Sequence, residues 1–147
     1  MKKAASACLC GIACRYNGKE VTNLNENEKK YLPVCPEILG GLSAPRTPVE
    51  IQGNIINNSY DDLVASKIKV VDKEGNDYSQ IFIESADKGL KIILDNDIEE
   101  VLLKDGSPTC GCNLIYDGTF TSNKIAGNGV FCALLKKYGI KIIEWSE

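Results

Sequence analysis

Three cysteines of this sequence each stand near the end of a short hydrophobic run. Cys8 closes A-A-S-A-C, Cys35 closes Y-L-P-V-C, and Cys110 lies in S-P-T-C-G after a third apolar run. In a parallel α/β sheet, strand ends of this kind converge on one edge, where such folds build their sites. Three thiolates at one point, in a chain without histidine, indicate a metal site. If three is the full count, a tetrahedral metal or a cluster iron keeps one position open for substrate.

Strand-like and helix-like segments alternate along the chain. We expect buried strands at residues 3–8, 31–35, 67–71, 100–103 and 140–145. We expect helices at residues 78–96 and from about 128 to Gly139, a brief helix at 25–30, and an ordered loop at 37–51. The alternation predicts a single three-layer α/β/α domain over residues 1–147, with a mainly parallel, Rossmann-like sheet. Right-handed crossovers would place the three cysteine loops on the same edge.

The composition excludes several functional classes. The chain has 147 residues, 44% of them hydrophobic and 25% charged, with a net charge of -3. A mildly acidic chain argues against non-specific nucleic-acid binding, which needs a basic face. No apolar stretch approaches the roughly 20 residues of a membrane-spanning helix. We therefore expect a cytoplasmic protein, and a small nucleobase is not excluded as its substrate.

The seven cysteines leave several interpretations open. An odd number cannot pair fully within one chain, and in a reducing cytosol clustered cysteines are more often ligands or redox groups than disulfides. Some of them could be small core hydrophobes, an interpretation that fits Cys132 best. Structural zinc favours C-x-x-C pairs, and none occurs here. Without histidine, proton transfer falls to carboxylates, hydroxyls, lysine or metal-bound water.

Four motifs resemble one known family. They are S-A-C-L-C-G-I-A-C-R-Y-N-G (6–18), P-V-C-P-E-I-L-G-G-L-S-A-P-R (33–46), G-S-P-T-C-G (106–111) and I-Y-D-G-T-F (115–120). Together they resemble the thiouracil desulfurase family, from about Ala5 to the final strand. The resemblance implies a 4Fe-4S cluster held by three cysteines, with a free fourth iron that binds the sulfur of the substrate.

The resemblance also implies roles for individual residues. Cys8, Cys35 and Cys110 would be the cluster ligands, and Glu37 and Ser107 the acid–base and proton-handling groups. Each of the last two has a simpler explanation. Glu37 is also the glutamate that the macrodipole favours at a helix N-terminus, and Ser107 precedes a proline as turn residues often do.

Arg46 and Asp117 are the predicted substrate-binding residues. Arg46, in A-P-R-T-P, could neutralise an anionic ring or the cluster, but a surface or ion-pair arginine fits the pattern equally well. Asp117, in Y-D-G-T, also fits a turn.

The sequence departs from the family pattern at three positions. Cys10 replaces the usual leucine, Cys112 is an addition, and Asn17 replaces the commoner aspartate. Cys10 and Cys112 each lie two residues from an implied ligand. Either could reach the fourth iron or accept sulfur, or both could be bystander thiols, since ligand geometry strictly limits reach.

These features together predict an iron–sulfur-dependent desulfidase. It would remove sulfur from thiocarbonyl compounds such as 2-thiouracil or a related thiolated nucleobase, giving the oxo product and hydrogen sulfide. Because the reaction is a net hydrolysis, it needs no external electron donor. Two alternatives are a non-catalytic iron–sulfur or persulfide sulfur carrier and a zinc-stabilised binding module.

Overall fold

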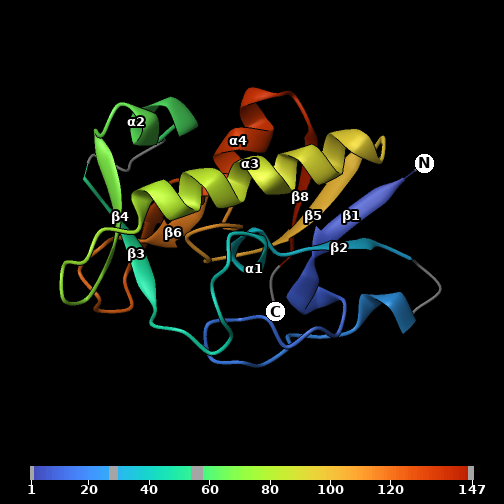
Figure 1. Cartoon of the computed structure of the whole chain (residues 1–147), viewed down its shortest axis with the longest axis horizontal. Helices are drawn as coiled ribbons and strands as arrows, with labels where there is room; N and C mark the ends of the chain where they lie inside the picture. Colours follow the sequence, from blue (N-terminus) through green and yellow to red (C-terminus); the bar gives the residue numbers. More distant parts are fainter. Residues whose placement is uncertain (1, 27–29, 54–57, 146–147) are drawn as a thin grey trace.

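The computed structural model describes residues 2–26, 30–53 and 58–145, and its centre is a parallel sheet (Figure 1). In spatial order the four strands are β2 (Leu32–Val34), β1 (Lys3–Ser6), β5 (Glu100–Lys104) and β8 (Lys141–Trp145). Ala4 of β1 lies opposite Leu32 on one side and Val101 on the other. The predicted α/β class with a mainly parallel sheet is therefore confirmed.

The central strands are buried on both faces, as continuous apolar runs in parallel sheets usually are. Ala4, Ala5, Val101 and Leu103 have no solvent exposure. This burial explains why the short runs could be recognised as strands although they lack an alternating pattern.

In the described part of the chain four α-helices pack together, and α3 and α4 among them share a core with the central strands. They are α1 (Pro36–Leu39), α2 (Tyr60–Val64), α3 (Ser79–Asp95) and α4 (Val130–Lys137). Figure 1 shows the long helix α3 crossing the molecule, and it packs against both α1 and α4. Phe82 and Ile93 of α3 and Phe131 of α4 enter the same core as Val101. No helix in the described residues is long and apolar enough to cross a membrane.

The face of the sheet opposite to this core is covered by less regular chain. Two 3-10 turns, η1 (Ala7–Leu9) and η2 (Leu24–Glu26), lie in this layer. Leu9 and Cys14 form a second cluster there, against Leu102 and Trp145 of the sheet. Residues 10–26 lack helical periodicity, and so this third layer consists of turns and loop.

Most predicted elements appear close to their expected positions. The helix expected at 78–96 is α3, the strand at 100–103 is β5, and the last helix and strand are α4 and β8. Gly139 follows α4 with φ +71, the left-handed conformation of a helix C-cap. A brief helix was expected at 25–30. Residues 25 and 26 belong to the 3-10 turn η2, and residues 27–29 lie outside the described residues.

Two antiparallel strand pairs were not expected. β3 (Val49–Gly53) pairs with β4 (Ile68–Asp72), and β6 (Leu114–Tyr116) pairs with β7 (Lys124–Ala126). The strand expected at 67–71 is confirmed as β4, but it pairs outside the central sheet. The loop expected at 37–51 is partly wrong, because α1 and β3 both extend into it. Three-residue strands such as β6 and β7 are too short to show a period in sequence.

Candidate active site

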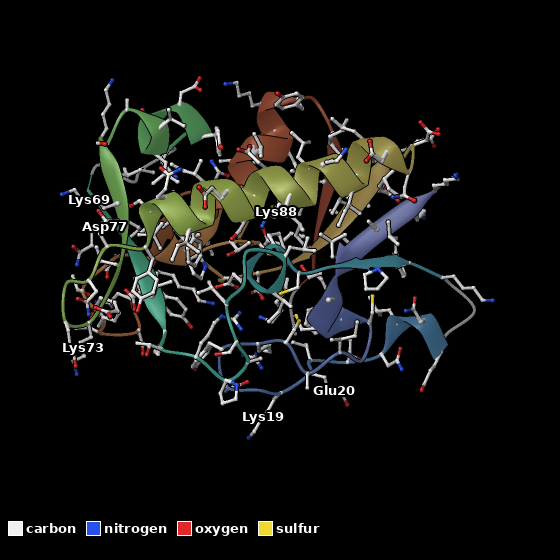
Figure 2. All side chains as sticks on the ribbon, viewed as in Figure 1. Lys19, Glu20, Lys69, Lys73, Asp77 and Lys88 are labelled. Atoms are coloured by element: carbon white, nitrogen blue, oxygen red, sulfur yellow. The ribbon has the colours of Figure 1, made fainter. Side chains whose placement is uncertain are left out.

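The structure brings the three expected cysteine ligands to one edge of the sheet. Cys8 lies in η1, directly after β1, and Cys35 lies between β2 and α1. Cys110 lies in the loop that follows β5. Because β2, β1 and β5 are adjacent parallel strands, their carboxyl ends meet here. Figure 2 shows sulfur atoms beside α1 and the end of β1.

A cavity of about 380 Å³ opens at this edge. Its volume falls in the range of pockets that hold small molecules. All but one of the residues predicted for the site line its wall. They are Cys8, Cys35, Cys110, Glu37, Ser107 and Arg46. The motifs that are separate in sequence therefore form one site.

A fourth cysteine, Cys14, lines the same cavity and was missed by the sequence analysis. Its side chain is buried and packs with Cys8 and Cys35. A hydrogen bond with Cys35 lowers the pKa of Cys14, but one with Cys8, burial and the charge of Cys8 together raise that pKa to about 11. The sequence did contain one indication that Cys14 belongs to the site, because Cys14 follows Cys8 in the same loop.

Cys35 and Cys110, which also line the cavity, resist ionisation as well. The hydrogen bond with Cys14, followed by burial and the charge of Cys14, raises the pKa of Cys35. Burial raises the pKa of Cys110, against a hydrogen bond from Ser6 that lowers it. Thiols so close together cannot all ionise unless a cation is bound among them. A bound metal centre would remove the free-energy cost of ionising several neighbouring thiols.

Ser107 shapes the loop that carries Cys110. Its Oγ accepts hydrogen bonds from the backbone N–H groups of Thr109 (3.0 Å) and Cys110 (3.2 Å). The turn role considered from the sequence is thus present. A hydroxyl that accepts two hydrogen bonds still has its own O–H to donate. Ser107 lines the cavity, and so that donor is available there.

The same loop is held against the start of α4. The N–H of Gly129 donates to the carbonyl of Gly111 (2.7 Å), and the N–H of Val130 donates to Pro108 (2.7 Å). A Cβ on Gly129 would lie only 2.5 Å from the carbonyl oxygen of Thr109. Only glycine therefore allows α4 to approach the Cys110 loop this closely.

Replacement of Gly129 by alanine is expected to lower the free energy of unfolding by about 2–3 kcal/mol, because the added methyl overpacks a backbone contact. Urea denaturation followed by circular dichroism measures the change. Gly75→Ala is the control, since a Cβ there meets nothing within 4 Å and only the φ of +87 opposes it. That control is expected to lose about 1 kcal/mol. Equal losses in the two variants would contradict the steric role of Gly129.

Glu37 and Arg46 form an ion pair at the cavity wall. Arg46 Nη2 lies 2.9 Å from Glu37 Oε2, and the two side chains are only 9% and 13% exposed. Arg46 Nη1 donates to the carbonyl oxygens of Cys14 (2.9 Å) and Ser43 (3.0 Å). The guanidinium is thus occupied by protein groups, and it connects Glu37 to the loop that carries Cys14.

Asp117 lies outside the set of described residues that line the cavity. Its Oδ1 accepts hydrogen bonds from the backbone N–H (3.0 Å) and the Oγ1 (2.6 Å) of Thr119, in the loop between β6 and β7. This arrangement fits the turn role considered from the sequence. The predicted contact with substrate receives no support from the geometry.

Comparison with known proteins identifies the family. Residues 4–147 match the family model described as 2-thiouracil desulfurase. The chain belongs to the 2-thiouracil desulfurase family. YbbK, an uncharacterized protein of Bacillus subtilis (strain 168), is 40% identical over 146 residues, covering 97% of this chain and 94% of that protein. The solved structure of the 4Fe-4S-dependent thiouracil desulfidase TudS is 36% identical, with a TM-score of 0.80, covering 97% of this chain and 89% of that one.

The two cysteines that depart from the pattern of this desulfurase family lie outside the cavity wall. Cys10 and Cys112 are buried and are not among the described residues that line the cavity. Cys112 Sγ instead lies 2.6 Å from Sγ of Cys132 on α4. Neither thiol is placed to reach a metal in the cavity, which favours the bystander interpretation.

The chemistry of the cavity wall fits an iron–sulfur cluster. All the soft donors are cysteine sulfurs, the ligands that hold such clusters in proteins. Within the described residues, no group of three or more Cys, Asp or Glu side chains is arranged to hold a single metal ion. A cluster does not require that arrangement, because each cysteine binds a different iron. The thiols of the desulfurase cavity are therefore compatible with a multi-iron centre.

Proposed function

We propose that this protein is a 4Fe-4S-dependent desulfidase that converts the C=S group of a thiolated nucleobase, such as 2-thiouracil, to C=O and releases hydrogen sulfide. The observation that carries the proposal is the convergence of Cys8, Cys35 and Cys110 with Glu37 on one small-molecule cavity. Membership of the 2-thiouracil desulfurase family and the similarity to TudS support it. Seven free thiols suit a reducing compartment, and we place the reaction in the cytoplasm.

Cys8, Cys35 and Cys110 would hold the cluster, one from each of three adjacent strand ends. When bound, the cluster would supply a soft iron that binds the thiocarbonyl sulfur and draws electron density from the C=S bond. Cys14 is the remaining thiol of the cavity. We place it beside the ligand set, because three ligands leave one position for substrate.

Glu37 is the base in this proposal. It accepts a proton from the water whose oxygen bonds to the thiocarbonyl carbon, and it returns that proton to the sulfur as the C–S bond breaks. The hydroxyl left on the carbon gives up the second proton of the water as the C=O bond forms, and that proton completes the hydrogen sulfide. One water and one C=S group thus yield one C=O group and one hydrogen sulfide, with no net transfer of electrons. Ser107 donates its O–H to the departing sulfur or to a ring oxygen.

Arg46 orients Glu37 in this scheme. Three of its five N–H donors bind the carboxylate of Glu37 and the carbonyl groups of Cys14 and Ser43, which fixes the guanidinium against the protein. We therefore assign Arg46 the positioning of the base, in place of the substrate contact expected from the sequence.

Anaerobic reconstitution with iron and sulfide tests the proposal. The expected product has iron and acid-labile sulfide in the ratio of a 4Fe-4S cluster, and it converts 2-thiouracil to uracil with one hydrogen sulfide per uracil. A protein fully loaded with cluster that turns over no thiolated base would reject the enzymatic proposal. Reconstituted protein that binds no iron would reject the cofactor. Anaerobically purified protein that contains zinc in place of iron would reject it as well.

A further inference from the structure

The β6–β7 hairpin, which the sequence analysis missed, forms one wall of the cavity. It contributes Tyr116 from β6, Phe120 and Ser122 from the connecting loop, and Lys124 from β7. None of the proposed chemical groups comes from this hairpin. It therefore faces the cavity without a role in the reaction described above.

The hairpin loop is tied firmly to β3. Glu50 accepts hydrogen bonds from the N–H groups of Gly118 (2.9 Å) and Phe120 (3.2 Å), and Gln52 Nε2 donates to the carbonyl of Gly118 (2.7 Å). A Cβ on Gly118 would lie 2.7 Å from the carbonyl oxygen of Ile51, so the loop sits directly on the strand. The rings and the lysine of the hairpin are thus presented from a supported backbone.

The cavity wall is cationic although the chain as a whole has a net charge of -3. Among the described residues, five cationic and three acidic side chains line it. They are Arg15, Arg46, Lys73, Lys104 and Lys124, and Glu37, Glu50 and Asp105. Arg46 is paired with Glu37, and Lys104 with Asp105 (2.6 Å), while Glu50 is used by the hairpin loop. The surplus positive charge favours an anionic ligand.

Lys124 is the cation of the hairpin wall. Its Nζ lies 5.3 Å from the centroid of the Tyr116 ring. It also reaches over Gly106, where a Cβ would lie 3.0 Å from Nζ, and so it sits beside the loop that begins at Ser107. Within the described residues it has no salt bridge to a carboxylate.

We propose that the β6–β7 hairpin is the substrate-recognition element, in which Lys124 binds an anionic group carried by a heteroaromatic ring and Tyr116 and Phe120 contact the ring. The proposal rests on the desulfidase function and names the substrate chemistry of that same cavity. The anionic group has two sources: a ring nitrogen or oxygen of the deprotonated thiobase, or a phosphate attached to it. Both would be held by the same charge-assisted contact.

Lys124→Gln tests the proposal in the cluster-loaded protein. The Michaelis constant is measured with 2-thiouracil, 2-thiouridine and 2-thiouridine 5′-monophosphate. We expect it to rise about ten-fold for the anionic substrate, the size of one charge-assisted hydrogen bond. A rise for the base and the monophosphate alike assigns the contact to the ring, and a rise for the monophosphate alone assigns it to the phosphate. Lys124→Arg should restore most of the affinity.

Lys69→Gln is the matched control, since Lys69 is an exposed lysine of β4 that does not line the cavity (Figure 2). It should leave every constant unchanged. Michaelis constants within two-fold of the wild type for all three substrates in Lys124→Gln would overturn the inference.

Calorimetric binding of uracil and uridine 5′-monophosphate to the same proteins separates the two proposals. If the wild type binds these products more tightly than Lys124→Gln but turns over no thiobase, only the desulfidase function fails.

Discussion

Cys35→Ser is expected to abolish both cluster assembly and desulfidation. A serine hydroxyl is a hard donor that holds iron–sulfur clusters poorly, and the two remaining ligands leave two irons without a cysteine. Cys35 is partly exposed at the mouth between β2 and α1, so the replacement should leave the fold intact. Iron and acid-labile sulfide per chain after anaerobic reconstitution should fall to background, and hydrogen sulfide release from 2-thiouracil should fall with them.

The other cysteines supply the controls for this prediction. Cys8→Ser and Cys110→Ser should behave as Cys35→Ser does, whereas Cys14→Ser should retain iron. Cys10→Ser is the matched control outside the cavity. If Cys14→Ser loses the cluster while Cys8→Ser or Cys110→Ser keeps it, Cys14 belongs to the ligand set and our assignment is wrong.

Glu37→Gln should reduce the turnover number by about 10²- to 10⁴-fold, the usual contribution of a positioned general base. Glutamine has nearly the same shape, and its carbonyl oxygen can still accept the hydrogen bond from Arg46. The structural role of the pair is thus largely kept while the base is removed. Single-turnover conversion of 2-thiouracil under anaerobic conditions measures the rate, and iron content confirms that the variant carries as much cluster as the wild type.

Glu84→Gln is the control for the base, because Glu84 is an exposed glutamate of α3 that is absent from the cavity wall. It should leave the rate unchanged. A sulfur carrier would be little affected by Glu37→Gln. An unaltered rate of sulfur release in that variant would therefore favour the carrier and remove Glu37 from the mechanism.

The expected strands and ligands followed from local patterns. Cys8, Cys35 and Cys110 could be placed together because each follows a buried strand, and parallel strands deliver their ends to one edge. The boundaries of α3 and β5 were predictable because burial imposes its period on a long helix and an unbroken apolar run on an inner strand. These features depend only on neighbours along the chain.

The partners of the site residues could not be predicted in this way. For Arg46 the sequence left a substrate or cluster contact and an ion pair equally open. The structure shows the ion pair, with Glu37, and a hydrogen bond to the carbonyl of Cys14, 32 positions away. Cys14 itself had no strand end to mark it. The β6–β7 hairpin is too short for a periodic signal, and its place at the cavity depends on Glu50, 68 residues before Gly118.

The amino-acid sequence alone therefore specifies the family, the three cysteines proposed as ligands and the edge of the sheet where they meet, because motifs and strand ends are local properties of the chain. Only the tertiary structure decides which arginine pairs with Glu37, which further thiol lines the cavity and which side chains of the hairpin face it. Those relations are made by hydrogen bonds and packing between distant segments, and the free energy of such contacts depends on a geometry that exists only once the layers have come together.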